Sequence, residues 1–259
     1  MPTKTVVFVH GLFMSCNSWQ HWVTYFERQG YSAQAIAWPG RDKSVKQLLA
    51  EHPNPEVGQQ TFAAMIEHHE QVIRSLDEPP IIIGHSLGGL VTQLMLNRGL
   101  GAAGIAIDSA PPKGVISTEW SFIKSAWPLV NPFNPASRPY LMPFEGFQYA
   151  FANGMPLDEQ KRAYEQVVPE SIRLARGSLT ADAAIDFKRQ HTPLLMIAGE
   201  IDHIIPASLV RKNAKRYEAS KPSVTEIHEF AGRNHALVGA KGWEEIADYS
   251  LAWIAKHGV

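Results

Sequence analysis

The sequence predicts an α/β protein built on a doubly wound, mainly parallel sheet of six strands. The first observation is that short apolar runs, typical of strands, alternate along the chain with longer segments whose apolar residues recur at helical spacing. The second is that the clearest of these runs are uninterrupted and β-branched, as expected of strands covered on both faces. The third is the length of 259 residues, which suits one large α/β core. Such folds place their sites at the carboxyl ends of the strands.

The composition is that of a globular protein with a small-molecule partner. Hydrophobic residues make up 45% of the chain and charged residues 19%. The formal net charge is −1 and there is no basic run, so the sequence lacks the electrostatic footprint of a protein that binds nucleic acid or an anionic membrane. No stretch approaches the roughly 18 apolar residues of a membrane helix. We therefore expect neither a nucleic-acid partner nor a membrane partner.

The single cysteine and the N-terminal sequence both favour a cytoplasmic protein. Cys16 has no second cysteine to pair with inside the chain, so the fold must be stabilised by packing. The apolar run near the N-terminus is interrupted by His10 and Gly11, and no small-residue cleavage site follows it. We therefore interpret this run as a strand of the mature protein and not as an export signal.

The first part of the chain alternates strands and helices. A buried strand over residues 6–9 leads into a His-Gly loop, and Asn17 or Ser18 is a candidate N-cap for a helix that ends at Gly30. The elements expected next are a short strand over 33–37, a loop region with at most a short helix over 41–60, and a long helix over 62–76.

The stretch that follows places a serine between a buried strand and a helix. The strand is the β-branched run 81–83, and apolar residues then recur at helical spacing as far as Gly99, a candidate C-terminal cap. Gly84, Ser86 and Gly88 fit the pattern G-x-S-x-G. In this pattern the turn from strand to helix is so sharp that the serine is strained and its neighbours two residues away must lack side chains. The serine hydroxyl then faces a helix N-terminus, whose free N–H groups can stabilise an oxyanion.

The second half of the chain contains an insertion between regular elements. A strand over 104–107 delivers Asp108 to its carboxyl end, and residues 113–190 then break the alternation. We assign 113–190 to a helical cap, inserted into a core formed by residues 1–112 and 191–259. The core elements expected after the cap are strands over 194–197 and 224–227, a helix over 206–217 and a closing helix over 243–254.

Three residues that follow predicted strands have the chemistry of a catalytic triad. Ser86, Asp202 and His235 occur in the chain order nucleophile, acid, histidine. A serine hydroxyl is too weakly acidic to attack a carbonyl unaided, so a neutral imidazole must accept its proton and later return it to the leaving group. The carboxylate orients that imidazole and stabilises its charged form. Asp108 also ends a strand and is the alternative candidate for the acid.

Four short motifs carry a resemblance to a known family: His10-Gly11, Gly84-His85-Ser86-Leu87-Gly88-Gly89, Gly199-Glu200-Ile201-Asp202 and Gly232-Arg233-Asn234-His235. In these motifs the chain resembles the α/β-hydrolase superfamily, in its capped serine esterase and haloperoxidase-like branch, over nearly its whole length outside the insertion. The resemblance implies the α/β-hydrolase fold. It also implies a serine hydrolase with Ser86 as nucleophile, His235 as general base and Asp202 as the acid.

The same resemblance implies an oxyanion hole made of backbone N–H groups. The donors would be those of Leu12 and Leu87, with Phe13 as a neighbouring candidate for the first position. Loss of one such donor typically costs about 3 to 4 kcal/mol of transition-state stabilisation. His10 is expected to fix the oxyanion loop, whereas His85 occupies the variable position of the serine motif and is assigned no role in proton transfer.

The insertion is rich in aromatic residues and is punctuated by prolines, which favours short helices and turns over one long helix. Within it, residues 144–151 and 158–168 are predicted to be helices. It is too short to bury a core by itself, so we interpret it as a lid on the sheet. Its aromatic wall favours an acyl or aryl group near Ser86. The predicted substrate contacts are Phe13, Phe122, Trp127, Phe144 and Phe147.

Signals for a metal or a cofactor are weak. His68 and His69 are adjacent, so on a helix their side chains would point about 100 degrees apart and could not both grip one ion. The sequence has no phosphate-binding loop, and its G-x-G-x-x-G match at residues 99–104 follows a predicted helix and leads into a strand, whereas a dinucleotide site needs the match to follow a strand and open a helix. We expect the protein to need neither a metal nor a cofactor.

Together these features predict a hydrolase of carboxylic esters, or of related lactones or thioesters, with a small to medium apolar part. The reaction would pass through an acyl-enzyme on Ser86. Two alternatives stay open from the sequence: an enzyme like the hydroxynitrile lyases, and a non-catalytic small-molecule receptor on the same fold.

Overall fold

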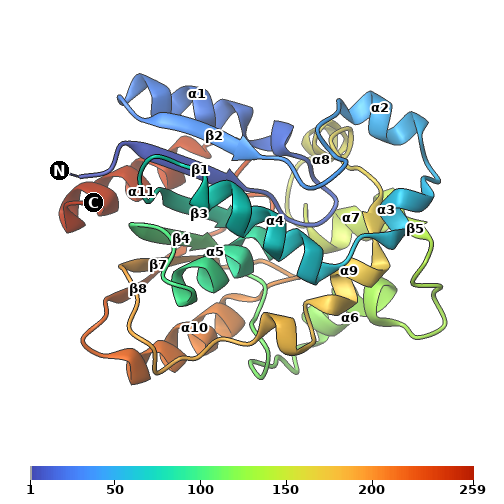
Figure 1. The fold of residues 1–259 in the computed structure, drawn as a ribbon. Helices are drawn as coiled ribbons and strands as arrows, with labels where there is room; N and C mark the ends of the chain where they lie inside the picture. Colours follow the sequence, from blue (N-terminus) through green and yellow to red (C-terminus); the bar gives the residue numbers. More distant parts are fainter. Residues whose placement is uncertain (1) are drawn as a thin grey trace.

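A computed structural model describes residues 2–259 and contains the predicted six-stranded sheet. The strand order is β2-β1-β3-β4-β7-β8, and every neighbouring pair is parallel (Figure 1). The strands are β1 (Thr5–Val9), β2 (Ser32–Ile36), β3 (Ile81–His85), β4 (Ala103–Ile107), β7 (Leu194–Gly199) and β8 (Thr225–Phe230). The predicted fold class is therefore confirmed.

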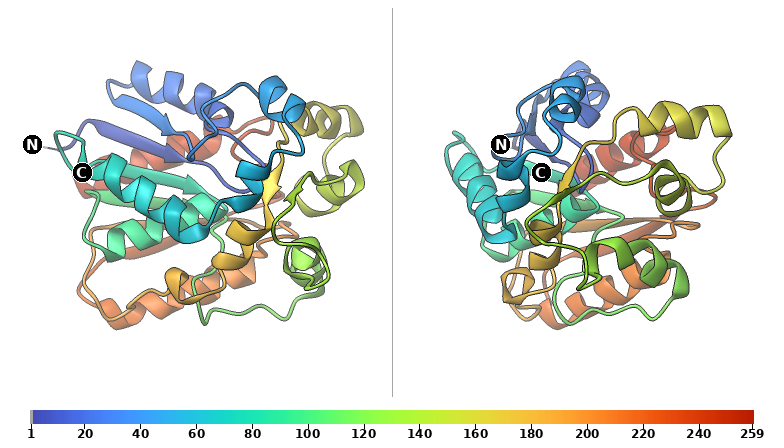
Figure 2. Two further views of the ribbon diagram at one scale, coloured as in Figure 1. Left: turned by 45° about the vertical axis from the view of Figure 1, so that its right-hand side comes forward. Right: turned by 90° about the vertical axis from the view of Figure 1, so that its right-hand side faces the viewer.

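Helices cover both faces of this sheet, which divides the core into two clusters. On one face lie α4 (Phe62–Arg74), α5 (Leu87–Asn97) and α10 (Ala207–Arg216), and on the other α1 (Gln20–Arg28) and α11 (Glu244–His257) (Figures 1 and 2). Successive residues of one strand point to opposite faces, so Val7 joins the first cluster and Phe8 the second. This double burial explains why the strand sequences read as continuous apolar runs.

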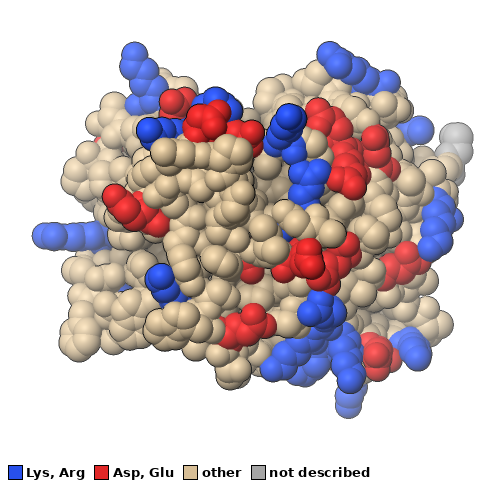
Figure 3. All heavy atoms as spheres, turned by 180° about the vertical axis from the view of Figure 1, so that it is seen from behind, with Lys and Arg blue, Asp and Glu red and all other residues tan. Residues whose placement is uncertain are grey.

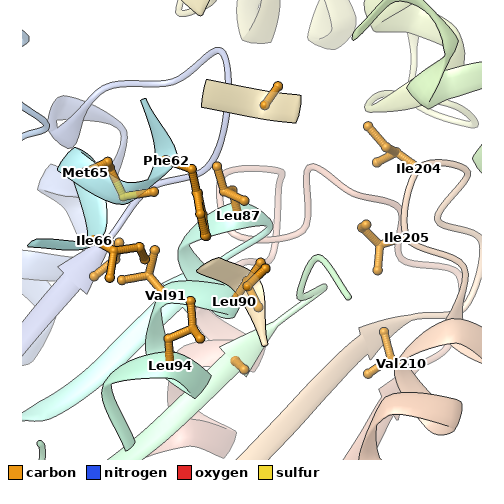
Figure 4. Close-up of a cluster of buried hydrophobic side chains, with 14 of the residues drawn as sticks. Phe62, Met65, Ile66, Leu87, Leu90, Val91, Leu94, Ile204, Ile205 and Val210 are labelled. Carbon is orange, nitrogen blue, oxygen red and sulfur yellow. The ribbon is translucent and has the colours of Figure 1, made fainter. Parts of the chain in front are cut away.

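The first cluster fixes the helix that follows Ser86. Phe62 and Ile66 of α4 approach Leu87 and Val91 of α5 (Figure 4). All four of these side chains are buried. Because α5 is also packed against β3 and β4, its N-terminus has a fixed position at the edge of the sheet.

The second cluster is dominated by aromatic rings. Phe8 stacks on Trp19 with ring centroids 5.0 Å apart and meets Phe26 edge to face at 5.3 Å. Trp19 lies in the 3-10 turn η1 (Cys16–Trp19), from which α1 begins. The expected cap by Asn17 or Ser18 is therefore wrong: the chain enters the helix through this turn, whose N-cap is Ser15 and has no side-chain capping bond.

Two short helices occupy the region where at most one was expected. They are α2 (Val45–Ala50) and α3 (Pro55–Gln59). Ser44 and Gln47 form a complete capping box at the start of α2, and the Asn54 side chain caps α3. These capping signals are present in the sequence and compensate for the low apolar content of the region.

The insertion lies over the carboxyl ends of the strands, at the opposite end of the molecule from the C-terminus (Figures 1 and 2). Its elements are α6 (Trp120–Val130), β5 (Pro139–Tyr140), α7 (Phe144–Ala150), α8 (Leu157–Tyr164), β6 (Glu170–Ser171), α9 (Ile172–Gly177) and the 3-10 turn η2 (Ala181–Ala183). The predicted helices correspond to α7 and α8, but α8 ends at Tyr164 and not at 168. Beyond α8 the chain packs onto the body, with β6 against α3 and α9 against α4.

The remaining irregular element of the core is the 3-10 turn η3 (Tyr217–Ser220), which extends α10.

On the face of the molecule seen in Figure 3, acidic and basic side chains lie close to one another between larger uncharged areas. This mixture agrees with a formal net charge of −1. Among residues 2–259, no helix combines the length and the apolar character required to cross a bilayer.

The turn at Ser86 is built by backbone segments in very close contact. A Cβ atom on Gly84 would lie 2.0 Å from the carbonyl oxygen of Gly88, and one on Gly88 would lie 2.1 Å from that of Val9. Both obstacles are backbone atoms, so they cannot move aside without displacing a strand or a helix. Ser86 itself has a φ of 57°, the left-handed region that side chains rarely adopt. The glycines of the G-x-S-x-G pattern are thus required by packing.

Substitution of Gly88 should therefore be far more damaging than substitution of a helical glycine elsewhere. We expect Gly88→Ala to lower the free energy of unfolding by about 3 kcal/mol or more, because the added methyl group overlaps the backbone of β1. The matched control is Gly146→Ala in α7, where the nearest atom would be 3.4 Å away. This control should be neutral or stabilising by up to about 1 kcal/mol. Urea denaturation measures both, and equal effects would contradict the packing argument.

Candidate active site

The three predicted triad residues lie together at the carboxyl edge of the sheet. Ser86 directly follows β3, Asp202 lies in the loop after β7, and His235 lies in the loop after β8. All three are buried, with exposed fractions of 7%, 3% and 0%. Parallel strands end at the same edge, so residues far apart in the chain are brought to one place.

Asp202 is positioned to orient the imidazole of His235. Its Oδ2 atom lies 2.6 Å from Nδ1 of His235. Its Oδ1 atom accepts hydrogen bonds from the backbone N–H groups of Ile204 and Ile205, at 2.8 and 2.9 Å. With both oxygens engaged as acceptors, the carboxylate cannot rotate freely. It therefore selects the imidazole tautomer with the proton on Nδ1 and leaves Nε2 as the basic nitrogen.

The Nε2 atom of His235 is buried and has no hydrogen-bond partner within residues 2–259. The Ser86 hydroxyl likewise makes no hydrogen bond to the described part of the chain, and no bond joins the two groups. Catalytic hydrogen bonds are often long before substrate binds and tighten in the substrate complex. The His235 ring is held from two sides, by His85 at a centroid distance of 4.5 Å and by Phe151 at 4.9 Å.

Asp108 is a second buried carboxyl group beside the same imidazole. Its Oδ2 atom lies 4.0 Å from Nδ1 of His235, and its Oδ1 atom accepts the backbone N–H of Gly199 at 2.7 Å. Burial, and then the nearby negative charge of Asp202, raise the pKa of Asp108 well above its usual range. Asp108 is therefore disposed to carry a proton. By geometry, Asp202 is the acid that holds the imidazole.

The backbone at the candidate oxyanion hole distinguishes between the two predicted donors of the first position. Leu87 is the first residue of α5, so its N–H has no acceptor within the helix. The N–H of Leu12 donates no hydrogen bond within residues 2–259. The N–H of Phe13, in contrast, donates to Oε2 of Glu170 at 3.1 Å. Phe13 is therefore not a free donor, and that alternative is corrected.

Gly11 allows the oxyanion loop to approach the nucleophile. A Cβ atom on Gly11 would lie 2.7 Å from Cβ of Ser86 and 3.2 Å from its Oγ. His10 stacks on Trp38 with ring centroids 4.3 Å apart, and its Nδ1 atom lies 2.9 Å from the Gly11 carbonyl oxygen. Burial lowers the pKa of His10 to about 3, so the ring is neutral and packs as part of the scaffold.

His85 is also buried and neutral. Burial, and then the adjacent His235, lower the pKa of His85 well below its usual range. A group this weakly basic is a poor proton acceptor.

One atom each of His85, Asp108 and His235 lies within 4.8 Å of the others, a spacing that could hold a cation. A metal would have to displace the proton favoured on Asp108, and His235 is already bonded to Asp202, so the three residues are poorly suited to hold a metal.

A cavity of about 540 Å³ opens beside His235, whereas Ser86 and Asp202 do not line it. Its wall includes Gly11, Met14, Phe147, Phe151 and His235. Four predicted contacts lie elsewhere. Phe13 is buried between Tyr140 and Phe151. Phe144 packs on Tyr164. Trp127 is 52% exposed, and Phe122 packs at the edge of the first core cluster.

The cavity also contains residues that the sequence analysis missed. Phe151 stacks on Phe147 at 5.5 Å, and the spacing of four residues along one helix could have indicated the pair. Met155 lies on the same wall, whereas Arg162 and Lys241 are exposed residues on its lining. Arg162 and Lys241 come from segments far apart in the chain, so the sequence itself shows no basic cluster.

The chain thus combines a parallel sheet covered on both faces with a serine in a strained turn after β3 and an Asp–His pair from later loops. A sequence profile described as the Alpha/beta hydrolase family matches residues 6–249. The chain therefore belongs to the α/β-hydrolase family.

Solved structures with the same fold cover nearly the whole chain. A monoacylglycerol lipase from Paleococcus ferrophilus is 20% identical with a TM-score of 0.69, covering 99% of this chain and 96% of its own. An extracellular α/β-hydrolase from a Paenibacillus species is 18% identical with a TM-score of 0.73, covering 97% of this chain and 98% of its own. That protein is described as sharing structural and functional homology with tobacco salicylic acid binding protein 2. Polyneuridine aldehyde esterase is 16% identical with a TM-score of 0.68, covering 96% of this chain and 98% of its own.

At these identities the likeness establishes the fold alone. No match was found among curated proteins.

The two carboxyl groups beside His235 should respond very differently to substitution. Asp202→Asn should lower kcat/KM for an activated ester by about 10⁴-fold, because an amide no longer selects the correct tautomer. Asp108→Asn should retain most of the activity, since the amide imitates a protonated carboxyl group. Steady-state kinetics of both variants measures this contrast. A loss in Asp108→Asn equal to that in Asp202→Asn would contradict the assignment of the acid.

Asp108 should also make stability depend on pH. The native state keeps the Asp108 proton at pH values where the unfolded chain has lost it, so stability falls as pH rises from the ordinary value of 3.8 through the raised native pKa. Asp108→Asn removes this dependence. Its melting temperature should therefore exceed that of the wild type increasingly as the pH is raised. Thermal melts at a series of pH values test the sign, and parallel curves for the two proteins would contradict it.

Proposed function

We propose that the protein is an esterase that cleaves carboxylic esters, or related lactones or thioesters, of small to medium apolar substrates. The observation that carries this proposal is the buried pair of His235 and Asp202, 2.6 Å apart, at the sheet edge where Ser86 occupies the strained turn. His235 can act as the base for a hydroxyl at that edge of the sheet, and Asp202 orients its imidazole.

The reaction follows from these positions. His235 accepts the hydroxyl proton as Ser86 Oγ attacks the ester carbonyl, and Asp202 stabilises the imidazolium. The N–H groups of Leu12 and Leu87 stabilise the oxyanion of the tetrahedral intermediate. The imidazolium then protonates the leaving alcohol, and an acyl-enzyme remains on Ser86. Water, activated by His235, releases the acid and restores the enzyme.

The cavity supports an apolar acyl or aryl group. Its volume of about 540 Å³ lies within the usual range for small-molecule sites. Met14, Phe147, Phe151 and Met155 supply an apolar wall, which favours a hydrocarbon group over a sugar or phosphate. Among structures of the same fold, two are named a monoacylglycerol lipase and an esterase, which supports ester chemistry.

An activity-based probe tests the nucleophile directly. A fluorophosphonate should label the wild-type protein at one site, because the activated hydroxyl attacks phosphorus and the adduct resembles the tetrahedral intermediate. Labelling should disappear in Ser86→Ala and persist in the control Ser178→Ala, whose hydroxyl is bonded to the backbone at the end of α9. The readout is intact-protein mass spectrometry. Folded wild-type protein that stays unlabelled would overturn the proposal and favour a receptor.

A panel of p-nitrophenyl esters of increasing acyl length tests the size of the substrate. We expect kcat/KM to be highest for short to medium chains, because the cavity is small and its apolar wall is local. Phe147→Leu should shift the preference towards longer chains, whereas the control Phe144→Leu, on the same helix but outside the cavity wall, should not. A maximum at long fatty acyl groups in the wild type would contradict this part. Release of cyanide from cyanohydrins without ester cleavage would favour a lyase instead.

A further inference from the structure

The insertion holds the oxyanion loop by both backbone groups of one residue. The N–H of Phe13 donates to Oε2 of Glu170 at 3.1 Å, and the carbonyl oxygen of Phe13 accepts the N–H of Val168 at 2.9 Å. Val168 and Glu170 both lie in the part of the insertion between α8 and α9. Phe13 itself has a φ of 65°, a conformation that is costly for a bulky side chain. The loop is therefore kept in an unfavourable conformation by contacts made from the insertion.

The carboxylate that makes this contact is fully buried and paired with Arg41. Nη2 of Arg41 lies 2.6 Å from Oε1 of Glu170, and Nη1 lies 3.2 Å from Oε2. The side chains are 1% and 0% exposed. Oε1 also accepts the N–H of Ser171 at 2.7 Å. Each carboxylate oxygen therefore has one bond to the guanidinium and one to the backbone.

Arg41 in turn is connected to the other end of the oxyanion loop. Its guanidinium lies 5.3 Å from the centre of the Trp38 ring, and Trp38 stacks on His10. Its Nε atom donates to the side chain of Gln60 at 3.2 Å. His10 begins the loop and Phe13 ends it, so the ion pair reaches the segment that contains Leu12 directly at Phe13 and through Trp38 at His10.

Stability alone is a weak reason for such a pair. Removing two charges from water costs several kcal/mol per ion, and a buried ion pair is often no more stable than apolar residues of the same volume. The contacts of Glu170 indicate a different purpose, because one of its four hydrogen bonds goes to the backbone beside the nucleophile. Arg41 also neutralises the carboxylate, whose charge would otherwise oppose the developing oxyanion nearby.

We propose that Glu170, neutralised by Arg41, is a positioning residue for the oxyanion hole: it fixes Phe13 in its left-handed conformation and so holds the N–H of Leu12 beside Ser86. This inference rests on the proposed esterase function. Oxyanion stabilisation depends on donors that are already in place when charge develops, so a displaced Leu12 N–H lowers the rate of the chemical step. Ground-state binding in the cavity depends on other residues and is not affected.

Two variants of different character test the proposal. Glu170→Gln keeps the shape and one acceptor but loses the charge, so kcat should fall on the order of tenfold. The double variant Arg41→Met/Glu170→Met leaves no unpaired charge but removes the acceptor for Phe13, so kcat should fall on the order of a hundredfold. In both, KM should stay within about twofold. Affinity for an alkylboronic acid, which forms a tetrahedral adduct with serine, should fall in proportion to kcat.

The matched control is Ser171→Ala, at the next position. Its hydroxyl bonds the carbonyl oxygen of Gln60 at 2.9 Å and caps α9, but has no contact with the oxyanion loop. This control should lower the melting temperature and leave kcat per folded molecule unchanged. If the Glu170 variants are less stable but equally active per folded molecule, the residue is only structural and the proposal is overturned. A wild-type protein without esterase activity or probe labelling would instead refute the proposed function.

Discussion

The site depends on the close contact between backbone segments at the turn that contains Ser86. The carbonyl oxygens of Val9 and Gly88 occupy the positions that Cβ atoms would take on Gly88 and Gly84. This contact joins β1, β3 and α5 in one rigid unit. The strained backbone at Ser86 is therefore maintained by the whole first core cluster, in which side chains of α4 pack against α5 and fix its position. With the nucleophile fixed in this way, only the loops that carry Asp202 and His235 have to adapt to it.

Burial of many ionisable groups at one edge of the sheet leaves few net charges there. His10 and His85 have lowered pKa values and stay neutral, whereas Asp108 has a raised pKa and tends to keep its proton. Glu170 is buried with a full counter-charge. The carboxylate of Asp202 is then the charge that lies against the imidazole of His235. A neutral surrounding of low dielectric constant strengthens that single interaction.

The strands and the G-x-S-x-G turn could be predicted from the sequence because each is encoded locally, by periodicity or by glycines at fixed spacing. The candidate triad residues could be proposed because each follows a predicted strand, and parallel strands end at one edge. The sequence also identified both Asp108 and Asp202, but only coordinates could show which one reaches Nδ1 of His235.

The contact between Arg41 and Glu170 joins residues 129 positions apart, and no local pattern indicates it. The cavity wall was predicted poorly for a similar reason. Aromatic content located the insertion, but the direction of each ring depends on how short helices settle on the body.

The anchoring of Phe13 by Val168 and Glu170 shows that parts of the insertion differ in what they contact. An inserted segment is commonly treated as an exchangeable unit that sets substrate range while the core supplies the chemistry. Here Val168 and Glu170 bind the loop that we propose as part of the oxyanion hole, although both lie outside the core in sequence. A chimera that replaced the whole of 113–190 would lose the partner of Arg41 and release the oxyanion loop. Changes in α7 and α8, in contrast, can alter the cavity wall while the contacts of Val168 and Glu170 with Phe13 stay in place.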